Sequence, residues 1–301
     1  MVTVATFTSI INQLLPEPHA GLLAGILFGT KATLSKSLYQ DLVTTGTLHI
    51  VALSGMNITI IASLVSLTLL RFVSRRIASL LTILMIIGFV WFVGFSPSII
   101  RAAIMGTISL LAVIFGKQKW ALFSWALAVG IMLLINIGWL IDISFQLSAL
   151  ATLGIILFAG TLRNDFPRED SGQAGQAGSQ NSNREDQIEK KSLLFVFIRV
   201  LYSFVIRVLK DDLRTTLAAQ VFTIPIILFH FHRISIVSPL SNVLIGWMIA
   251  PVTIIGLLTV LLGVIWLPLG QIFAWASWVF LEYLLQVVTA TSRLPFASFG
   301  L

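Results

Sequence analysis

The sequence contains no cysteine and few charged residues, and each shortage excludes a class of protein. Without cysteine the chain has no disulfide, no thiolate metal site and no cysteine nucleophile. Charged residues make up only 10% of the 301 positions, whereas hydrophobic residues make up 57%. A water-soluble domain carries about 25% charged residues. The composition therefore excludes an ordinary soluble domain and indicates a chain that folds in a lipid bilayer.

Short motifs for nucleotide hydrolysis and metal binding are also missing. A nucleotide-binding loop ends in Gly-Lys followed by Ser or Thr, whereas the segment from Gly25 to Lys31 has a different spacing. His230 and His232 are two residues apart, which places them on different faces of a helix, and no carboxylate cluster accompanies them. We therefore expect no enzyme activity, no metal ion and no cofactor, and any energy source must be external.

Apolar runs recur along the chain at the length that a bilayer requires. A helix of about 20 apolar residues crosses the roughly 30 Å hydrocarbon core, and the alternating segments of a closed barrel are not seen. The sequence therefore predicts an all-α, polytopic transmembrane helical bundle with about 8 to 9 spans. The clearest spans cover residues 48–70, 77–95, 98–116, 121–141, 143–160, 215–232, 238–266 and 270–290.

Breaks in this pattern divide the chain into four parts. Residues 8–30 form a shorter apolar run that Pro16, Pro18 and Gly29 interrupt, which is typical of an interfacial or re-entrant element. Residues 193–209 contain two arginines, and the sequence leaves open whether they cross the bilayer or lie in its interface. The expected parts are an interfacial or re-entrant N-terminal element (1–47), a first transmembrane half (48–160), a disordered cytoplasmic linker (161–192) and a second transmembrane half (193–301).

Polar side chains inside apolar spans are costly in hydrocarbon and mark candidate functional sites. The first group is His49, Ser54, Gly55 and Asn57. Ser54 and Asn57 are three residues apart and share a helix face, while Gly55 weakens the helix between them. This pattern predicts either a backbone opening that contacts an ion or a substrate, or close helix packing through Ser54 and Gly55.

Two further groups lie at the beginnings of spans. Pro97 suits a helix N-terminus and places Arg101 about one turn into the membrane, where its permanent charge either reaches the headgroups or points into a pore. Asp142 and Gln146 are four residues apart and form a polar stripe that lipid would reject. Asp142 either lines a pore or pairs with Arg101.

The last group is divided between two helices. Gln220 lies before Pro225 on one helix, and Asn242 lies near the start of the next, where Pro239 suits the first helical position. Pro225 is expected to kink its helix and free a carbonyl four residues back, and Pro251 is expected to break the following helix. Broken helices with amide side chains nearby are typical of a lined cavity.

The order of these motifs resembles the competence domain of the ComEC family, over about residues 20 to 255. The resemblance rests on five pieces in one order: Gly46-Thr-Leu-His49 with Ser54-Gly55, Pro97-Ser-Ile-Ile-Arg101, Asp142-Ile-Ser-Phe-Gln146, Gln220 with Pro225, and Ser238-Pro-Leu-Ser-Asn242 with Pro251.

The resemblance implies a multi-pass channel in the inner (plasma) membrane that admits single-stranded DNA during natural transformation. The expected partners are single-stranded DNA, the lipid bilayer, and a separate DNA-translocating motor, DNA receptor and nuclease. Arg101 would then attract phosphate, and Ser54, Asn57, Gln146, Gln220 and Asn242 would offer uncharged hydrogen bonds along the DNA path.

Two departures from the family pattern limit this expectation. The family usually has histidine where this chain has Asn57, which cannot titrate. The chain also lacks the His-x-His-x-Asp-His run of the metallo-β-lactamase-like nuclease domain that relatives often carry, so we expect no DNA cleavage. A permease for a smaller solute is the main alternative, and an intramembrane serine hydrolase built on Ser54 is a weaker one because His49 lies on another helix face and no orienting carboxylate is near.

Overall fold

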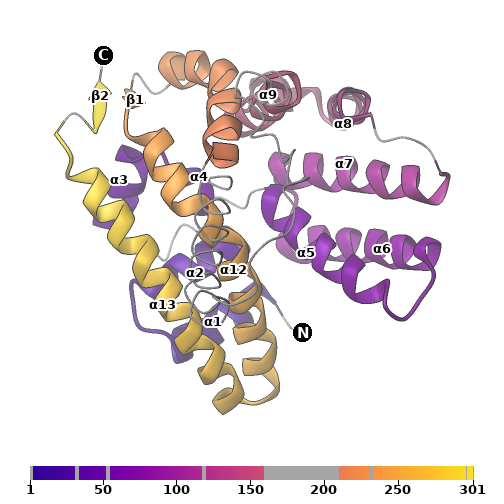
Figure 1. The fold of residues 1–301 in the computed structure, drawn as a ribbon, viewed down its shortest axis with the longest axis horizontal. Coiled ribbons are helices and arrows are strands. Elements are labelled where there is room, and N and C mark those ends of the chain that lie inside the picture. The colour runs from indigo at the N-terminus through magenta and orange to yellow at the C-terminus, as the bar shows by residue number, and fades with distance from the viewer. Residues whose placement is uncertain are drawn as a thin grey trace, which may run out of the picture.

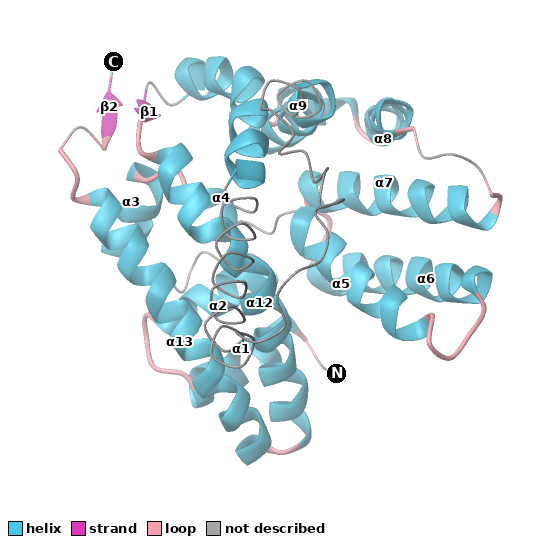
Figure 2. Ribbon diagram, viewed as in Figure 1, coloured by secondary structure: helices cyan, strands magenta, loops and turns pink. Residues whose placement is uncertain are grey.

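The computed structural model describes residues 3–30, 34–51, 55–116, 120–158, 210–230, 233–295 and 297–300. The expected linker 161–192 and the segment 193–209 lie outside these residues. The described part is helical apart from one short pair of strands (Figure 2). Its elements are α1 (Val4–Leu14), α2 (His19–Phe28), α3 (Lys36–Thr44), α4 (Leu48–Val51), α5 (Gly55–Leu69), α6 (Arg75–Val93), α7 (Pro97–Ile114), α8 (Ala121–Ile135), the 3-10 helix η1 (Ile137–Ile141), α9 (Ile143–Phe158), the helix Lys210–His230, β1 (Arg233–Ser235), α12 (Ser238–Ile265), α13 (Leu267–Ser292) and β2 (Ser298–Gly300).

The predicted all-helical class is confirmed, and five described helices are long and apolar enough to cross a bilayer. These are α6, α7, the helix Lys210–His230, α12 and α13. Four more apolar helices, α2, α5, α8 and α9, have 10–17 residues. The span predicted at 121–141 is divided at Asn136, whose side chain accepts a hydrogen bond from the backbone N–H of Gly138 (2.9 Å) and begins η1. The count of 8 to 9 spans stays a prediction.

The helices form two groups on either side of a central region (Figure 1). On one side, α12 and α13 run antiparallel as a long hairpin that packs against α1, α2 and α3. On the other side, α5, α6 and α7 pack together, with α8 and α9 against α7. Helix α5 runs away from α12, α6 runs back toward it, and α7 begins where α6 ends (Figure 1). The starts of α5 and α7 therefore lie close together, on the side that faces α12.

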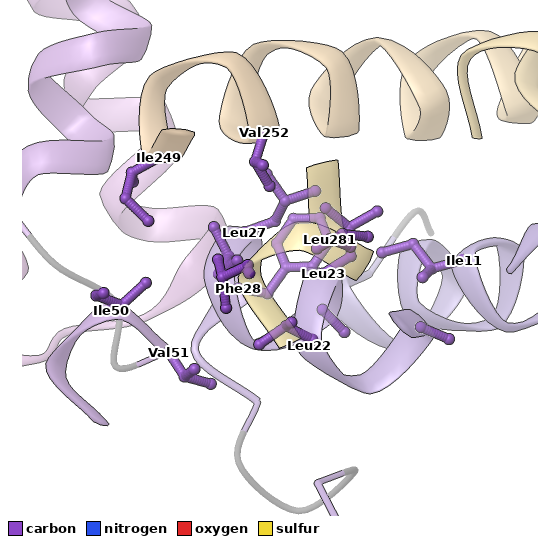
Figure 3. Packing of buried hydrophobic residues seen from close by; sticks show 14 of the residues in the cluster. Ile11, Leu22, Leu23, Leu27, Phe28, Ile50, Val51, Ile249, Val252 and Leu281 are labelled. Atoms are coloured by element: carbon purple, nitrogen blue, oxygen red, sulfur yellow. The ribbon is translucent and has the colours of Figure 1, made fainter. Parts of the chain in front are cut away.

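Helix α2 forms the middle of the hydrophobic core. All ten of its residues are buried, and apart from His19 its side chains are apolar on every face. Leu22, Leu23 and Ile26 are completely buried (Leu22 and Leu23 appear in Figure 3 beside Leu281 of α13). Gly256 of α12 lets Leu23 approach, since a Cβ there would lie 2.5 Å from a Leu23 methyl group.

The burial of α2 bears on the predicted N-terminal element. An interfacial helix keeps one face in water, whereas all ten residues of α2 are buried within the protein, and the choice between an interfacial and a re-entrant element stays a prediction. Helices α1 and α2 are also shorter than the roughly 20 residues that cross a bilayer. The re-entrant alternative is consistent with two short helices packed against α12 and α13.

Proline begins two helices as predicted but does not end the other two. Helix α7 starts at Pro97, and Pro239 is the second residue of α12. Helix Lys210–His230 continues through Pro225, and α12 continues through Pro251, so neither proline ends its helix, and the kink at Pro225 stays a prediction. An interior proline costs about 3 kcal/mol, but ending a helix inside hydrocarbon would leave more backbone groups without partners.

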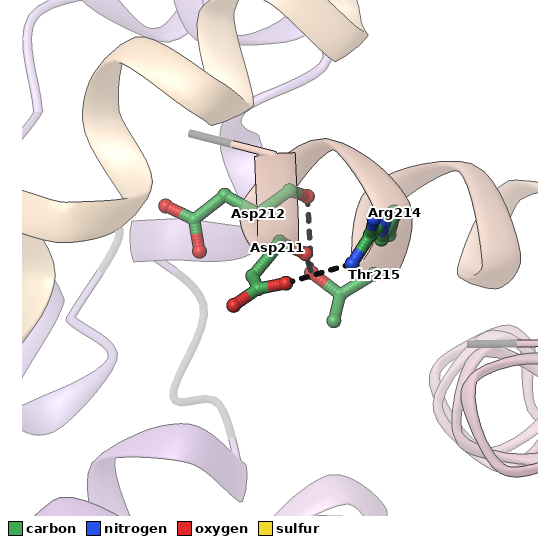
Figure 4. A network of polar contacts seen from close by, with 4 residues as sticks. All are labelled: Asp211, Asp212, Arg214 and Thr215. Atoms are coloured by element: carbon green, nitrogen blue, oxygen red, sulfur yellow. Dashed lines mark hydrogen bonds and ion pairs between the residues drawn. The ribbon is translucent and has the colours of Figure 1, made fainter. Parts of the chain in front are cut away.

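Charged residues lie in the first described turn of helix Lys210–His230 (Figure 4). Arg214 Nη1 contacts Asp211 Oδ1 at 3.1 Å, and the Thr215 hydroxyl donates to the carbonyls of Asp211 (3.1 Å) and Asp212 (3.0 Å). These charged side chains precede the apolar part of the described helix.

The strands β1 and β2, which the sequence analysis did not predict, pair antiparallel, with Arg233 opposite Gly300 and Ser235 opposite Ser298. Each strand has three residues, too few to produce a readable alternation. Their pairing places the described C-terminal residues next to the start of α12 (Figure 1).

Candidate functional site

The residues predicted to form a site occupy three separate places in the structure. Gly55, Asn57 and Arg101 form an arginine group where α5 meets α7. His49, Gln220 and Asn242 lie with Gly46 and Ser238 in a serine group at the start of α12. Asp142 and Gln146 lie at the start of α9. Ser54 lies outside the described residues.

Gly55 lets the backbone of α5 touch α7 at the position of Arg101. A Cβ atom at Gly55 would lie 2.8 Å from the Cβ of Ala102 and 3.3 Å from Nη2 of Arg101. Real Cβ contacts are not that short, so only glycine fits here without a shift of one helix. The predicted close packing at Gly55 is therefore observed, and it brings the α5 backbone to a guanidinium.

Arg101 is a buried cation. Its exposed fraction is 9%, and its Nε and Nη1 atoms have no hydrogen-bond partner among the residues that the structure describes. It forms no ion pair with any carboxylate in the described part of the chain. It also lies in the first turns of α7, whose N-cap residue Ser96 makes no side-chain cap. A helix N-terminus and a guanidinium both favour an anion, so this place has the electrostatics of an anion site.

Asn57 links α5 to α2. Its side chain is 1% exposed, and its Nδ2 donates to the carbonyl oxygen of Ile26 at 2.6 Å. Ile26 lies in the last turn of α2, where carbonyls have no partner within the helix. Asn57 therefore completes the end of α2 rather than facing an aqueous space with this nitrogen.

Replacing Asn57 by leucine is expected to lower the free energy of unfolding by about 1–3 kcal/mol, because a buried carbonyl loses its donor. Asn57→His is the control, since an imidazole N–H can donate to Ile26 and histidine is common at this position in the resembled family. Thermal unfolding of both variants in lipid nanodiscs measures the difference. Equal melting temperatures for the two variants would contradict the assignment.

The serine group joins three segments through the hydroxyl of Ser238. Gln220 Nε2 and Asn242 Nδ2 both lie 3.3 Å from Ser238 Oγ, and a Cβ at Gly46 would lie 2.7 Å from the same atom. Gly46 has φ = +69°, which favours glycine, and its carbonyl contacts His49 Nδ1 at 3.0 Å. The predicted amides thus meet at one hydroxyl: Gln220 reaches Ser238 from another helix, as packing residues do, and Asn242 reaches it from within α12.

The polar side chains at the start of α9 form hydrogen bonds within their own segment of the chain. Asp142 Oδ1 accepts a hydrogen bond from the backbone N–H of Phe145 (2.8 Å), and Gln146 Nε2 donates to the carbonyl of Leu140 (2.8 Å). The expected alternative of an Asp142–Arg101 ion pair is wrong. Aspartate before a helix satisfies free N–H groups locally, and this short-range bond prevails over a distant partner.

A pocket of about 290 Å³ lies between α5 and α12, and it is apolar. Its lining consists of Met56, Thr59, Ile60, Ser63, Leu64, Leu67 and Ile254. None of the predicted site residues lines it. This pocket therefore suits hydrocarbon chains better than a polyanion.

Sequence analysis missed one buried polar contact. His19 Nε2 of α2 lies 2.8 Å from Glu282 Oε2 of α13, and Gln286 Nε2 donates to the other carboxylate oxygen at 2.9 Å. The available signal was that Glu282 is the only charged residue in α13, all of which is described. An isolated acid in an apolar span should have been treated as a site with a partner elsewhere in the chain.

Comparison with known proteins identifies the family of the chain. Over 237 residues, or 78% of the chain, the sequence is 24% identical to ComE operon protein 3 of Bacillus subtilis (strain 168). The chain spans about a quarter (25%) of that protein's length. No solved structure matches. Residues 26–301 match the family described as Competence protein. With five apolar helices of membrane-spanning length, the chain is a multi-pass membrane protein that belongs to the Competence protein family.

Proposed function

We propose that this chain conducts single-stranded DNA through the cytoplasmic membrane during natural transformation, and that Arg101 is the contact for a DNA phosphate. Membership in the Competence protein family supports a role in DNA uptake. The observation that carries the phosphate contact is the buried guanidinium of Arg101, which lacks an ion pair in the described part of the chain. A separate motor, receptor and nuclease complete the proposed pathway.

Arginine suits a moving phosphate better than the other cations in the chain do. Its charge persists at any working pH, and its fork of N–H groups matches two phosphate oxygens. Two of its three nitrogens have no partner in the described ranges of the chain, so an arriving phosphate has no contact to displace there. The buried position lowers the effective dielectric constant and strengthens the contact.

A single cation is also compatible with passage. Rows of cations would hold a polyanion, whereas one contact per passing phosphate gives an affinity low enough to release it. The uncharged groups proposed for the rest of the path are Ser54, Gln146, Gln220 and Asn242. Gln220 and Asn242 have a hydrogen bond to Ser238 in this structure and would exchange it for DNA.

Arg101→Ala is expected to weaken binding of a single-stranded oligonucleotide by about tenfold or more, because a charge-assisted hydrogen bond contributes about 1.5–3 kcal/mol. The slope of log affinity against log salt should fall in magnitude by about 0.7 for one lost phosphate contact. Fluorescence anisotropy with the protein in nanodiscs measures both quantities. Arg101→Lys should be intermediate, since lysine keeps the charge without the fork.

Arg76→Ala is the matched control because Arg76 is exposed at the start of α6 and its loss removes the same charge. Transformation frequency in a competent host should fall with Arg101→Ala and remain unchanged with Arg76→Ala. An unchanged frequency with Arg101→Ala at normal expression would refute the phosphate contact. Weaker uptake of a small anion with unaffected oligonucleotide binding would favour the permease alternative.

A further inference from the structure

The apolar pocket between α5 and α12 is a groove that follows one face of α5. Six of its seven lining residues belong to α5, from Met56 to Leu67, and Ile254 of α12 forms the opposite wall. The α5 residues recur with the period of a single helix face, so they form one stripe along the helix. Over eleven residue steps this stripe is about 16 Å long. The groove is therefore long and narrow.

The lining of the groove suits hydrocarbon. Met56 is 45% exposed, Leu64 is 37% exposed and Leu67 is 66% exposed, so large apolar side chains are open to whatever fills the space. The Thr59 hydroxyl donates to the carbonyl of Gly55 at 3.0 Å and is thus satisfied within α5. Among the described residues that line the groove, none is charged. A polar ligand would lose its hydration here without gaining partners.

The volume of the groove distinguishes between apolar occupants. A helix about 10 Å wide occupies roughly 1,200 Å³ over about 16 Å, which is about four times the 290 Å³ of the groove. An extended hydrocarbon chain about 4–5 Å wide occupies about 200–300 Å³ over the same length. The groove therefore fits one hydrocarbon chain and is too small for a helix.

Arg71 lies just beyond one end of the groove. It follows Leu67 by four positions, which is about one helical turn. Its backbone N–H donates to the carbonyl of Thr68 at 3.2 Å, so helical turns continue past the end of α5. Arg71 thus extends the apolar stripe with a cation.

The turn between α5 and α6 carries positive charge without acids to balance it. Arg71 and Arg75 are exposed, and the sequence has no Asp or Glu between Asp41 and Asp142. Neither arginine forms an ion pair with a carboxylate in the described ranges. Helix α6 has the length of a membrane span and begins at Arg75, so this turn lies at a surface of the bilayer. Phospholipid phosphates lie at the same level.

We propose that the groove binds one acyl chain of an anionic phospholipid, whose headgroup phosphate contacts Arg71. Arg75 adds to the attraction for the headgroup. The acyl chain lies along the stripe from Leu67 to Met56 and fills the opening between α5 and α12. A zwitterionic phospholipid offers the same chain but a headgroup without net charge, so the arginines give the site its preference for an anionic lipid.

Native mass spectrometry of the full chain tests the headgroup contact. The protein is released from nanodiscs that contain equal amounts of phosphatidylglycerol and phosphatidylcholine, and the retained lipids are counted. We expect one retained phosphatidylglycerol, preferred about tenfold over phosphatidylcholine. Arg71→Ala should lower this preference about fivefold, since each cation near an anionic surface contributes about that factor. Arg293→Ala is the matched control because Arg293 is an exposed arginine just past the end of α13, and it should leave the preference unchanged.

A second pair of variants tests the acyl chain. Ile60 lines the groove, so the larger side chain of Ile60→Trp should occupy its volume and abolish retention of the lipid. Leu84→Trp is the matched control, since Leu84 is 64% exposed on α6 and does not line the groove. It should retain phosphatidylglycerol as the parent does.

Three outcomes would overturn the lipid site. Equal retention of the two lipids by the wild-type protein excludes the headgroup contact, whether or not the variants fold. Retention that survives Ile60→Trp shows attraction to the surface without a bound chain. Weaker oligonucleotide binding by Arg71→Ala with unchanged lipid retention makes Arg71 a nucleic-acid contact instead. A failure of the proposed phosphate contact at Arg101 would leave all of these lipid measurements unchanged, so the two proposals are tested separately.

Discussion

Replacing Gly154 with valine is expected to separate α9 from the helix Lys210–His230 and to lower the melting temperature by about 5 °C or more. A Cβ atom at Gly154 would overlap the backbone carbonyl oxygen of Ala218 and lie 3.2 Å from its carbon. Backbone atoms cannot rotate away as a side chain can, so one helix must move. The aromatic contact between Phe158 and Phe222, with ring centroids 5.8 Å apart, would open with it.

Gly130→Val is the control for Gly154→Val. Gly130 lies in α8, and nothing is within 4 Å of a Cβ built there. The same substitution should therefore leave the melting temperature unchanged or raise it slightly, because glycine is a poor helix former. Thermal unfolding in the same detergent or nanodisc compares the two. A Gly154→Val protein as stable as Gly130→Val would show that α9 does not pack on Ala218.

Replacing Gly55 with valine is expected to reduce transformation by about a hundredfold, which is more than the loss of Arg101 alone. The new side chain would enter the space of the Ala102 methyl group and push against Nη2 of Arg101. It would thus displace the guanidinium and also part α5 from α7. Two effects of about 1–3 kcal/mol each combine to give this factor.

Gly88→Val separates this local effect from a general intolerance of larger side chains. Gly88 lies in α6, and nothing is within 4 Å of a Cβ placed on it. Transformation frequency and membrane expression should both remain normal for Gly88→Val. Normal transformation by Gly55→Val would show that the contact between α5 and Arg101 is not needed for DNA uptake.

The features that were predictable from sequence are those that depend on neighbouring residues. The start of α7 at Pro97 follows from the fixed φ of proline and its missing N–H group. The apolar lengths of α6, α12 and α13 follow from hydropathy alone. These properties need no knowledge of what the helix packs against.

The features that were missed depend on contacts between distant segments. Arg101 and Asp142 both looked like ends of spans, yet Asp142 bonds within four residues and leaves the arginine without it. The pairing of His19 with Glu282 requires the position of α2 against α13, which no local pattern contains. Likewise, α12 continues through Pro251 because a helix end inside hydrocarbon would leave backbone groups without partners. This cost outweighs the local preference of proline to end a helix.

The burial of α2 has a consequence for biogenesis. Its ten buried residues, nine of them apolar, pack against α12 and α13, and its one histidine contacts a carboxylate that is synthesised 263 residues later. During synthesis the segment therefore has no final neighbours for most of the time of translation. We expect α2 to remain bound to the insertion machinery or to a membrane chaperone until α12 and α13 have been synthesised. The hydrophobic core then forms only when the chain is complete.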